Sequence, residues 1–303
     1  MNNKTQAIPL SEAAKAANIS TRKRAFKFWL ISHLLMTKEA RIYIYMLHMY
    51  LRWADDFIDT TSNSAEDKIK FVRYLFTLKE KILNHHYDFN KLEEHYLYYS
   101  IKFAEGKNRP LILNCIDQYH ELFEMEANRL SRGGIYSKEE FERYVFVNIT
   151  SLMPVFHLFL YYNSATNIDY GVIGRFFLYV RLLKDFEEDV NVGYLNICKE
   201  DIEKYNLNTT NILNDPKRFL WAESFSTEIF KALFDELEVM AKAPLKVKLF
   251  WTLGYIYLAK EILQIKCYKF QFGCKIKKNI VTEIIILSST IRLGSKIIQK
   301  IFF

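Results

Sequence analysis

The stretch IYIYMLHMYLRWADDFID, residues 42–59, decides the fold of this sequence. Its first ten residues carry no charge, no Gly and no Pro, which predicts a largely buried helix. Three carboxylates, Asp55, Asp56 and Asp59, then follow Arg52. On a helix, Asp55 and Asp59 share a face, and Arg52 lies one turn before the first two acids. Core packing has no use for three carboxylates, so we expect this helix to end at a polar site.

A second stretch repeats this arrangement about 130 residues later. GVIGRFFLYVRLLKDFEED, residues 171–189, is again an apolar helical pattern that ends in acids. Arg181, Asp185 and Asp189 stand at i, i+4 and i+8, which places them on one stripe. Our interpretation is that the two acidic clusters face each other and hold Mg²⁺, which binds carboxylate and phosphate oxygens. The alternative is that both clusters are solvated helix ends.

The composition places these two stretches in an all-α protein. Nine Gly and five Pro among 303 residues are too few for the turns of an all-β or Rossmann-type chain. Helical patterns cover 21–36, 38–60, 65–85, 88–105, 110–130, 137–163, 168–190, 217–241, 244–270 and 277–300. We therefore expect one domain of about ten helices over residues 21–303, preceded by a flexible leader over residues 1–20. Residues 131–136 hold a Gly pair and are expected to be a loop, and Ser137 begins a capping box.

Charge and cysteine content narrow the classes of partner. A net charge of +7 suits an anionic partner, but the basic residues are dispersed, so nucleic-acid binding is not expected. The four cysteines form no CxxC pair and are interpreted as reduced thiols of a cytoplasmic protein. Residues 144–168 lack charge and could span a membrane, but their polar side chains favour a central core helix. The sequence leaves a peripheral membrane contact and the oligomeric state open.

Four segments resemble the squalene/phytoene synthase family. They are LHMYLRWADDFID (47–59), SKEEFERYVF (137–146), KDFEEDVNVGYLNICKEDIEKYNL (184–207) and YIYLAKEILQIKCYKFQFGCKIKK (255–278). The resemblance covers roughly residues 22–280. It implies an isoprenoid-synthase helical bundle around a central cavity, with two or three Mg²⁺ ions and a prenyl diphosphate substrate at the cavity mouth. The 16% aromatic content fits such a cavity, because aromatic faces stabilise a carbocation.

The resemblance also implies roles for individual residues. The family's catalytic metal ligands are matched by Asp55, Asp59, Asp185 and Asp189. We expect Asp56, next to Asp55, to be a further metal ligand. Arg52 matches an arginine that binds the diphosphate, and Arg181, Lys184 and Lys275 are expected to contribute positive charge. Phe28, Phe57 and Phe146 are candidates for the cavity wall. His48, one turn before Arg52, is a candidate diphosphate ligand or base; a structural core histidine is the alternative.

Several positions depart from the family pattern. His48 and Phe146 stand where the family has Tyr, Leu178 and Arg181 where it has Gln and Asn, and Tyr194 where it has Arg. In the family these groups serve the two-substrate reaction. We therefore expect a terpene synthase that ionises one farnesyl or geranylgeranyl diphosphate. Head-to-head condensation of two substrates, giving a squalene- or phytoene-type product, is the alternative, and a non-catalytic binding role is the third hypothesis.

Overall fold

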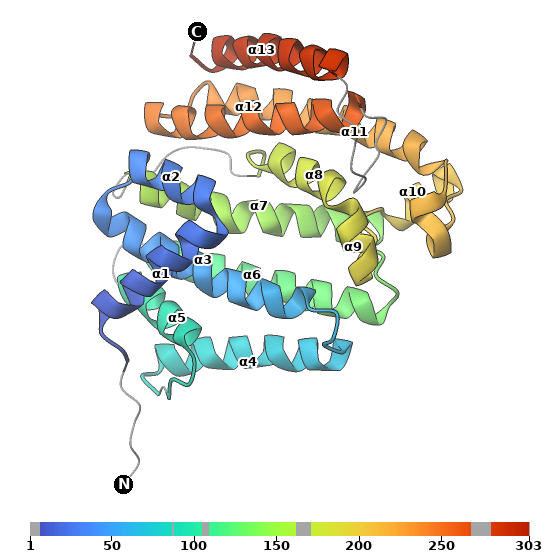
Figure 1. The fold of residues 1–303 in the computed structure, drawn as a ribbon. Coiled ribbons are helices and arrows are strands. Elements are labelled where there is room, and N and C mark those ends of the chain that lie inside the picture. Colours follow the sequence, from blue (N-terminus) through green and yellow to red (C-terminus); the bar gives the residue numbers. More distant parts are fainter. Residues whose placement is uncertain (1–6, 87, 105–108, 162–170, 268–279, 303) are drawn as a thin grey trace. The chain divides into compact units, whose positions relative to one another are not determined.

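A computed structural model of the chain describes residues 7–86, 88–104, 109–161, 171–267 and 280–302. The described residues form α-helices and one 3-10 helix and no strand (Figure 1). This confirms the predicted fold class. The chain groups into two compact units, 1–131 with 150–165 and 132–149 with 166–303.

The first unit contains α1 to α6 and the second half of α7. These helices are α1 (Leu10–Arg24), α2 (Phe26–Leu35), α3 (Lys38–Asp59), α4 (Ala65–Leu83), α5 (Leu92–Phe103), α6 (Arg109–Ser131) and α7 (Lys138–Tyr161). The quoted stretch forms α3, which packs against α1, α5 and α6. Thr37 ends the preceding segment and caps α3, since its side chain accepts a hydrogen bond from the Ala40 backbone N–H at 3.2 Å.

The structure differs from the predicted leader over residues 1–20. A helix already begins at Leu10, and Ala13 and Ala17 are fully buried. Small side chains at i and i+4 let α1 lie close against α3. The sequence pattern missed this helix because its buried residues, Ala13, Ala17 and Thr21, carry little hydrophobic signal.

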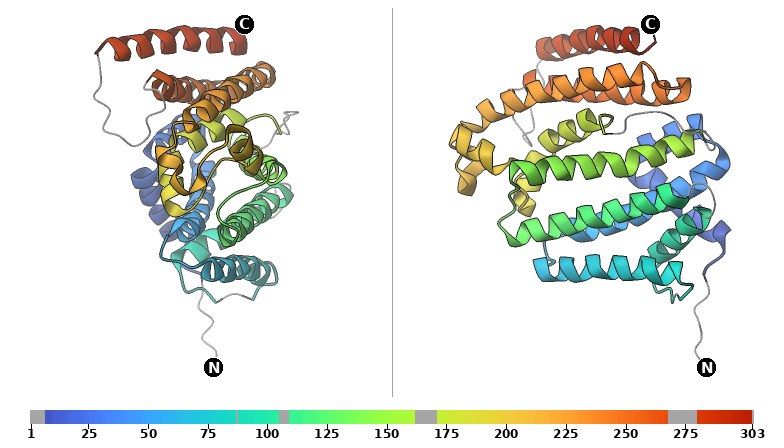
Figure 2. Two further views of the ribbon diagram at one scale, coloured as in Figure 1. Left: turned by 90° about the vertical axis from the view of Figure 1, so that its right-hand side faces the viewer. Right: turned by 180° about the vertical axis from the view of Figure 1, so that it is seen from behind.

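The second unit contains the first half of α7 and all later helices. These are α8 (Arg175–Lys184), α9 (Phe186–Val192), α10 (Lys199–Tyr205), the 3-10 helix η1 (Thr209–Asn214), α11 (Arg218–Met240), α12 (Leu245–Cys267) and α13 (Ile280–Phe302). Helix α8 packs against α11 and α12, and α12 packs against α13 (Figure 2). The predicted helix over 168–190 is two helices that meet at Asp185.

Helix α7 is the uncharged stretch noted in the sequence. Among the described residues, Lys138–Leu160 is the segment long and apolar enough to cross a membrane by length and composition. Of its apolar window, 61% is buried inside the protein, as expected of a core helix. The predicted capping box is present, because the Ser137 hydroxyl accepts from the Glu140 backbone N–H and the Glu140 carboxylate accepts from the Ser137 N–H.

Candidate metal and diphosphate site

The first acidic motif lies at the C-terminal end of α3. Its carboxylates meet the negative end of the helix dipole there, so nearby cations are needed to stabilise them. Arg52 supplies one: its Nη1 lies 3.0 Å from Asp55 Oδ2, and its Nε lies 2.9 Å from Asp56 Oδ1. Arg24, at the end of α1, pairs with the other oxygen of Asp56. Helix α1 thus delivers a cation to this motif.

Asp55 and Asp59 converge on a third carboxylate, Glu126 of α6. One ligand oxygen from each of the three lies within 4.8 Å of the others. Two oxygens on one Mg²⁺ are at most about 4.2 Å apart, since each bond is about 2.1 Å. The three oxygens must therefore move closer together to bind one ion, and the all-oxygen donor set fits Mg²⁺. The structure does not bring Asp56 into this cluster, because the two arginines hold both of its oxygens.

The sequence analysis missed Glu126. Helix α6 carries Glu121, Glu124 and Glu126 close together, and nothing in that pattern singles out one of them. Only the packing of α6 against α3 brings Glu126 to the end of the first motif. Lys68 of α4 is 1% exposed, and burial lowers the pKa of its ammonium group, although the negative charges of Asp59 and Glu126 act in the opposite direction.

His48 lies in an aromatic environment near this site. Its ring is 5.2 Å from the ring of Phe28, which also contacts Tyr45 and Phe156 edge-on. The Nδ1 atom is buried and has no hydrogen-bond partner among the described residues. Burial, followed by the positive charges of Arg52 and Arg24, lowers the pKa of His48 to about 4. His48 is therefore a neutral imidazole at neutral pH.

Phe57 contacts a different aromatic group from the one around His48. Its ring stacks on Phe71 of α4 at 3.9 Å between centroids. Trp53 contacts the same Phe71 ring edge-on at 5.2 Å. These two side chains join α3 to α4, so the structure gives them a packing role in the first unit.

The second acidic motif is held within its own unit. Arg181 Nε lies 3.5 Å from Asp185 Oδ2, and Lys184 Nζ lies 3.5 Å from Glu261 Oε2 of α12. Although the helix label changes at Asp185, the backbone hydrogen bonds from Asp185 N to Arg181 O and from Asp189 N to Asp185 O continue the helical pattern. The predicted stripe of Arg181, Asp185 and Asp189 therefore survives the break.

Asn196 fixes Asp189, the last acid of this motif. Asn196 is 5% exposed, and its amide donates to Asp189 Oδ2 at 2.6 Å. The segment that follows the motif is also tied down by the predicted Gly loop, since Leu195 N donates to Gly134 O at 3.0 Å.

Three other residues that the sequence analysis singled out are Phe146, Leu178 and Lys275. Phe146 is 43% exposed, with Arg143 over its ring at 6.0 Å. Leu178 is buried in α8 and offers no polar group. Lys275 lies outside the described residues.

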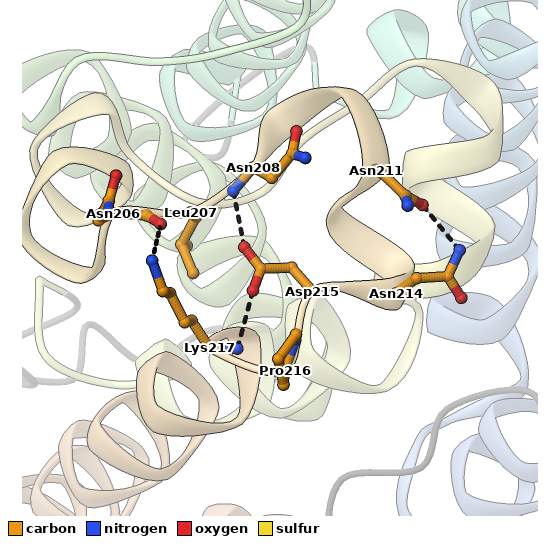
Figure 3. A pocket seen from close by; sticks show the side chains of 8 residues that line it. All are labelled: Asn206, Leu207, Asn208, Asn211, Asn214, Asp215, Pro216 and Lys217. Atoms are coloured by element: carbon orange, nitrogen blue, oxygen red, sulfur yellow. Dashed lines mark hydrogen bonds between the residues drawn. The ribbon is translucent and has the colours of Figure 1, made fainter.

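Two surface hollows are lined by other residues. One of about 410 Å³ lies around η1 in the second unit, where Asp215 accepts from the backbone N–H groups of Asn208 and Lys217 (Figure 3). These bonds lower the pKa of Asp215. The other, of about 470 Å³, lies between Asn18 and Phe26 in the first unit. Neither hollow is lined by an acidic motif, and the polar groups of the first are largely occupied by each other.

Comparison with solved structures connects this arrangement to a known fold. TcSQS, a squalene synthase solved with the ligand BPH1237, matches with a TM-score of 0.69 over 96% of this chain and 91% of that one, at 16% identity. A dehydrosqualene synthase solved with a ligand matches with a TM-score of 0.65 over 95% of this chain and 98% of that one, at 15% identity. The chain has the squalene synthase fold. No family model and no curated protein matches the sequence.

The two motifs lie at corresponding places on apolar helices. The first is in the last turns of α3, and the second begins where α8 ends, at Asp185. The fold was predicted from these motifs, and the near-complete coverage of both neighbours confirms that prediction. At this level of identity the likeness concerns the fold, so the reaction is argued separately below.

Proposed function

We propose that this protein is an isoprenoid synthase that binds a prenyl diphosphate through Mg²⁺. The observation that carries the proposal is the convergence of Asp55, Asp59 and Glu126 within 4.8 Å, beside Arg52. Bound Mg²⁺ would neutralise the diphosphate, so that it departs with the electron pair of the C–O bond. In the second motif, Asp185 and Asp189 would hold metal on the same substrate, as the sequence predicted.

The side chains around the motifs serve this chemistry in distinct ways. Arg52 and Arg24 orient Asp55 and Asp56 and add positive charge for the diphosphate oxygens. Arg181 and Lys184 provide the corresponding charge beside the second motif. His48 remains neutral, because its pKa of about 4 leaves it unprotonated at neutral pH. A neutral imidazole can accept a proton from a carbocation, which an imidazolium cannot.

For the reaction itself, we infer head-to-head condensation of two prenyl diphosphates. Both structural neighbours, a squalene synthase and a dehydrosqualene synthase, are named for such products and extend over nearly the whole chain. This reverses the order given by the sequence, which placed single-substrate ionisation first. That second candidate is favoured by a specific observation: Leu178 is buried and apolar where the family has Gln, and Arg181 pairs with Asp185 where the family has a metal-binding Asn.

Product analysis tests the proposal and separates the two reactions. The full chain is incubated with Mg²⁺ and geranyl, farnesyl or geranylgeranyl diphosphate, and the product mass is measured. We expect a C30 product from farnesyl diphosphate or a C40 product from geranylgeranyl diphosphate, with two diphosphates released per product. A C15 or C20 hydrocarbon or alcohol would establish the single-substrate reaction instead.

Two variants test whether the activity depends on this metal site. Asp59→Asn should lower turnover by about 100-fold or more, since it removes a metal ligand while keeping the side-chain volume. Glu66→Gln is the matched control, because Glu66 is an exposed carboxylate that pairs with Lys70 outside the cluster. Full activity of Asp59→Asn, or no product from any substrate, would contradict the proposal.

A further inference from the structure

Helix α2 is apolar on all sides, yet little of it is buried. Seven of its ten residues, FKFWLISHLL, are Phe, Trp, Leu or Ile, but its buried residue is Ser32. A helix of this composition is normally enclosed by other elements. Instead, Phe26, Leu30 and Leu34 are 52%, 43% and 72% exposed. They stand at i, i+4 and i+8, so they form one exposed apolar stripe along α2.

The end of α1 extends this stripe into a larger surface. Ile19 is 44% exposed, and together with Lys23 and Phe26 it lines the hollow of about 470 Å³. Lys15 and Lys23 are exposed one helical turn to either side of Ile19. We call these residues and the α2 stripe the α1–α2 surface. It holds four of the six large hydrophobic side chains that are exposed in the described part of the first unit, which are Ile19, Phe26, Leu30, Leu34, Tyr74 and Leu92.

Contacts between neighbouring helices hold α2 in place under this surface. Trp29 Nε1 donates to Asn18 Oδ1 of α1 at 2.9 Å, and the Arg22 guanidinium lies 5.1 Å from the centre of the Trp29 ring. Phe28 contacts Tyr45 of α3 edge-on. The apolar stripe is therefore presented by a helix that is fixed on α1 and α3.

Charge shows which partner this surface fits. Residues 13–38 include six Lys or Arg and no Asp or Glu. A second copy of the chain would bring the same positive charges together across a two-fold interface, which opposes association. A bilayer with anionic headgroups complements both features, since the headgroups attract Lys and Arg and the acyl region takes up apolar side chains. At about 1.5 Å per residue, α2 is about 15 Å long, half of what crossing a bilayer requires, so it would lie along the bilayer surface.

We propose that the α1–α2 surface docks this protein on an anionic lipid bilayer. Phe26, Leu30 and Leu34 enter the boundary between headgroups and acyl chains, and Lys15 and Lys23 contact the headgroups. None of these five side chains belongs to the acidic cluster of Asp55, Asp59 and Glu126, so the inference does not depend on the metal site.

The test measures cosedimentation of the full chain with lipid vesicles, in EDTA and without diphosphate. Vesicles of phosphatidylcholine alone are compared with vesicles in which about one lipid in three is phosphatidylglycerol. The wild type is expected to bind the anionic vesicles at least about tenfold more tightly, because several basic side chains lie near the lipid. Raised salt should weaken this binding, since it screens the attraction.

Single variants locate the binding on the α1–α2 surface. Leu30→Asn and Leu34→Asn should each weaken binding to anionic vesicles about fivefold, because an apolar side chain no longer enters the lipid. Lys23→Gln should also weaken it about fivefold. Leu92→Asn and Lys81→Gln are the matched controls, since both residues are exposed in the first unit outside this surface, and they should bind as the wild type does.

Three results would overturn the proposal. The first is equal binding of the wild type to both kinds of vesicle, or no binding to either. The second is binding by folded Leu30→Asn and Leu34→Asn that equals that of Leu92→Asn, with circular dichroism establishing the fold. The third is a lipid-free wild-type dimer in sedimentation velocity that Leu34→Asn dissociates, without vesicle binding, which would make this surface an interface between copies. All of these measurements omit metal and diphosphate, so their failure leaves the proposed function untouched.

Discussion

Glu236 shows how one residue can link the stability of a helix to pH. It is fully buried in α11, and its carboxyl group accepts from the Phe176 backbone N–H and from the Tyr255 hydroxyl, the latter at 2.7 Å. The bond to Phe176 satisfies a donor in the first turn of α8, which otherwise starts at Gly174 without a side-chain cap. Burial raises the pKa of Glu236 to about 7, although these hydrogen bonds and the charge of Arg175 act in the opposite direction.

This raised pKa predicts a pH-dependent loss of stability. Below the unfolded-state pKa, near 4.5, Glu236 is protonated in both states and its contribution is fully present. As pH rises to about 7, ionisation favours the unfolded chain, so stability falls by roughly 3 kcal/mol, at 1.36 kcal/mol per pKa unit. Glu236→Gln cannot ionise and should lose this component. Urea unfolding of both proteins between pH 4.5 and 8 measures it, and an unchanged difference between them across that range would contradict the assignment.

At the scale of elements, the Gly loop after α6 holds the segment that follows the second motif. Gly134 has a φ of +76°, and a Cβ there would lie 1.9 Å from the Gly193 carbonyl oxygen. Gly193 itself ends α9 with a φ of +101°. Residues 135 and 195 form an isolated bridge at the same place. Close backbone approach, rather than turn geometry alone, therefore requires glycine at position 134.

Gly133 and Gly134 make a matched pair for testing this contact. Gly133 also has a positive φ, +86°, but a Cβ there would meet nothing within 4 Å. Gly133→Ala should cost about 1 kcal/mol from backbone strain alone. Gly134→Ala should cost at least about 2 kcal/mol more, since backbone must also move. Urea unfolding of the two variants provides the comparison, and equal losses would show that the contact with Gly193 carries no energy.

At the scale of the whole molecule, the two acidic motifs belong to different compact units of the chain. Each unit has its own buried core, built around α3 in the first and around α8, α11 and α12 in the second. A ligand that binds the folded protein and not the unfolded chain raises the free energy of unfolding by mass action. If both motifs bind the same metal diphosphate, an acid from either unit should contribute to this effect.

We therefore predict that Mg²⁺ with inorganic diphosphate raises the melting temperature. At a ligand concentration 100 times Kd, the gain is about 2.7 kcal/mol, or roughly 5 °C for a chain of this size. Asp59→Asn and Asp185→Asn should each lose most of the shift, while Glu66→Gln keeps it. Differential scanning calorimetry with EDTA as the baseline makes the measurement. A full shift in Asp185→Asn would exclude the second motif from the site.

Local sequence patterns predicted most of the helices, but they missed helix α1 and the break at Asp185. Apolar periodicity and the scarcity of glycine predicted the helices, and Ser137 was found as a cap because capping depends on neighbours within one turn. Helix α1 was missed because its buried side chains, two alanines and a threonine, carry little hydrophobic signal. The break at Asp185 was missed because the helical hydrogen bonds run through it.

For the site, local spacing in the sequence was enough to show two groups of aspartates on helices beside arginines. That spacing is local, and it placed Asp55 and Asp56 with Arg52, and Asp185 with Arg181. The packing of the helices was needed to show that Glu126 joins the first motif and that Arg24 pairs with Asp56. The physical reason is that these contacts join different helices. Which face of α1, α4 or α6 meets the end of α3 is set by core packing across the whole unit, and no local pattern encodes it.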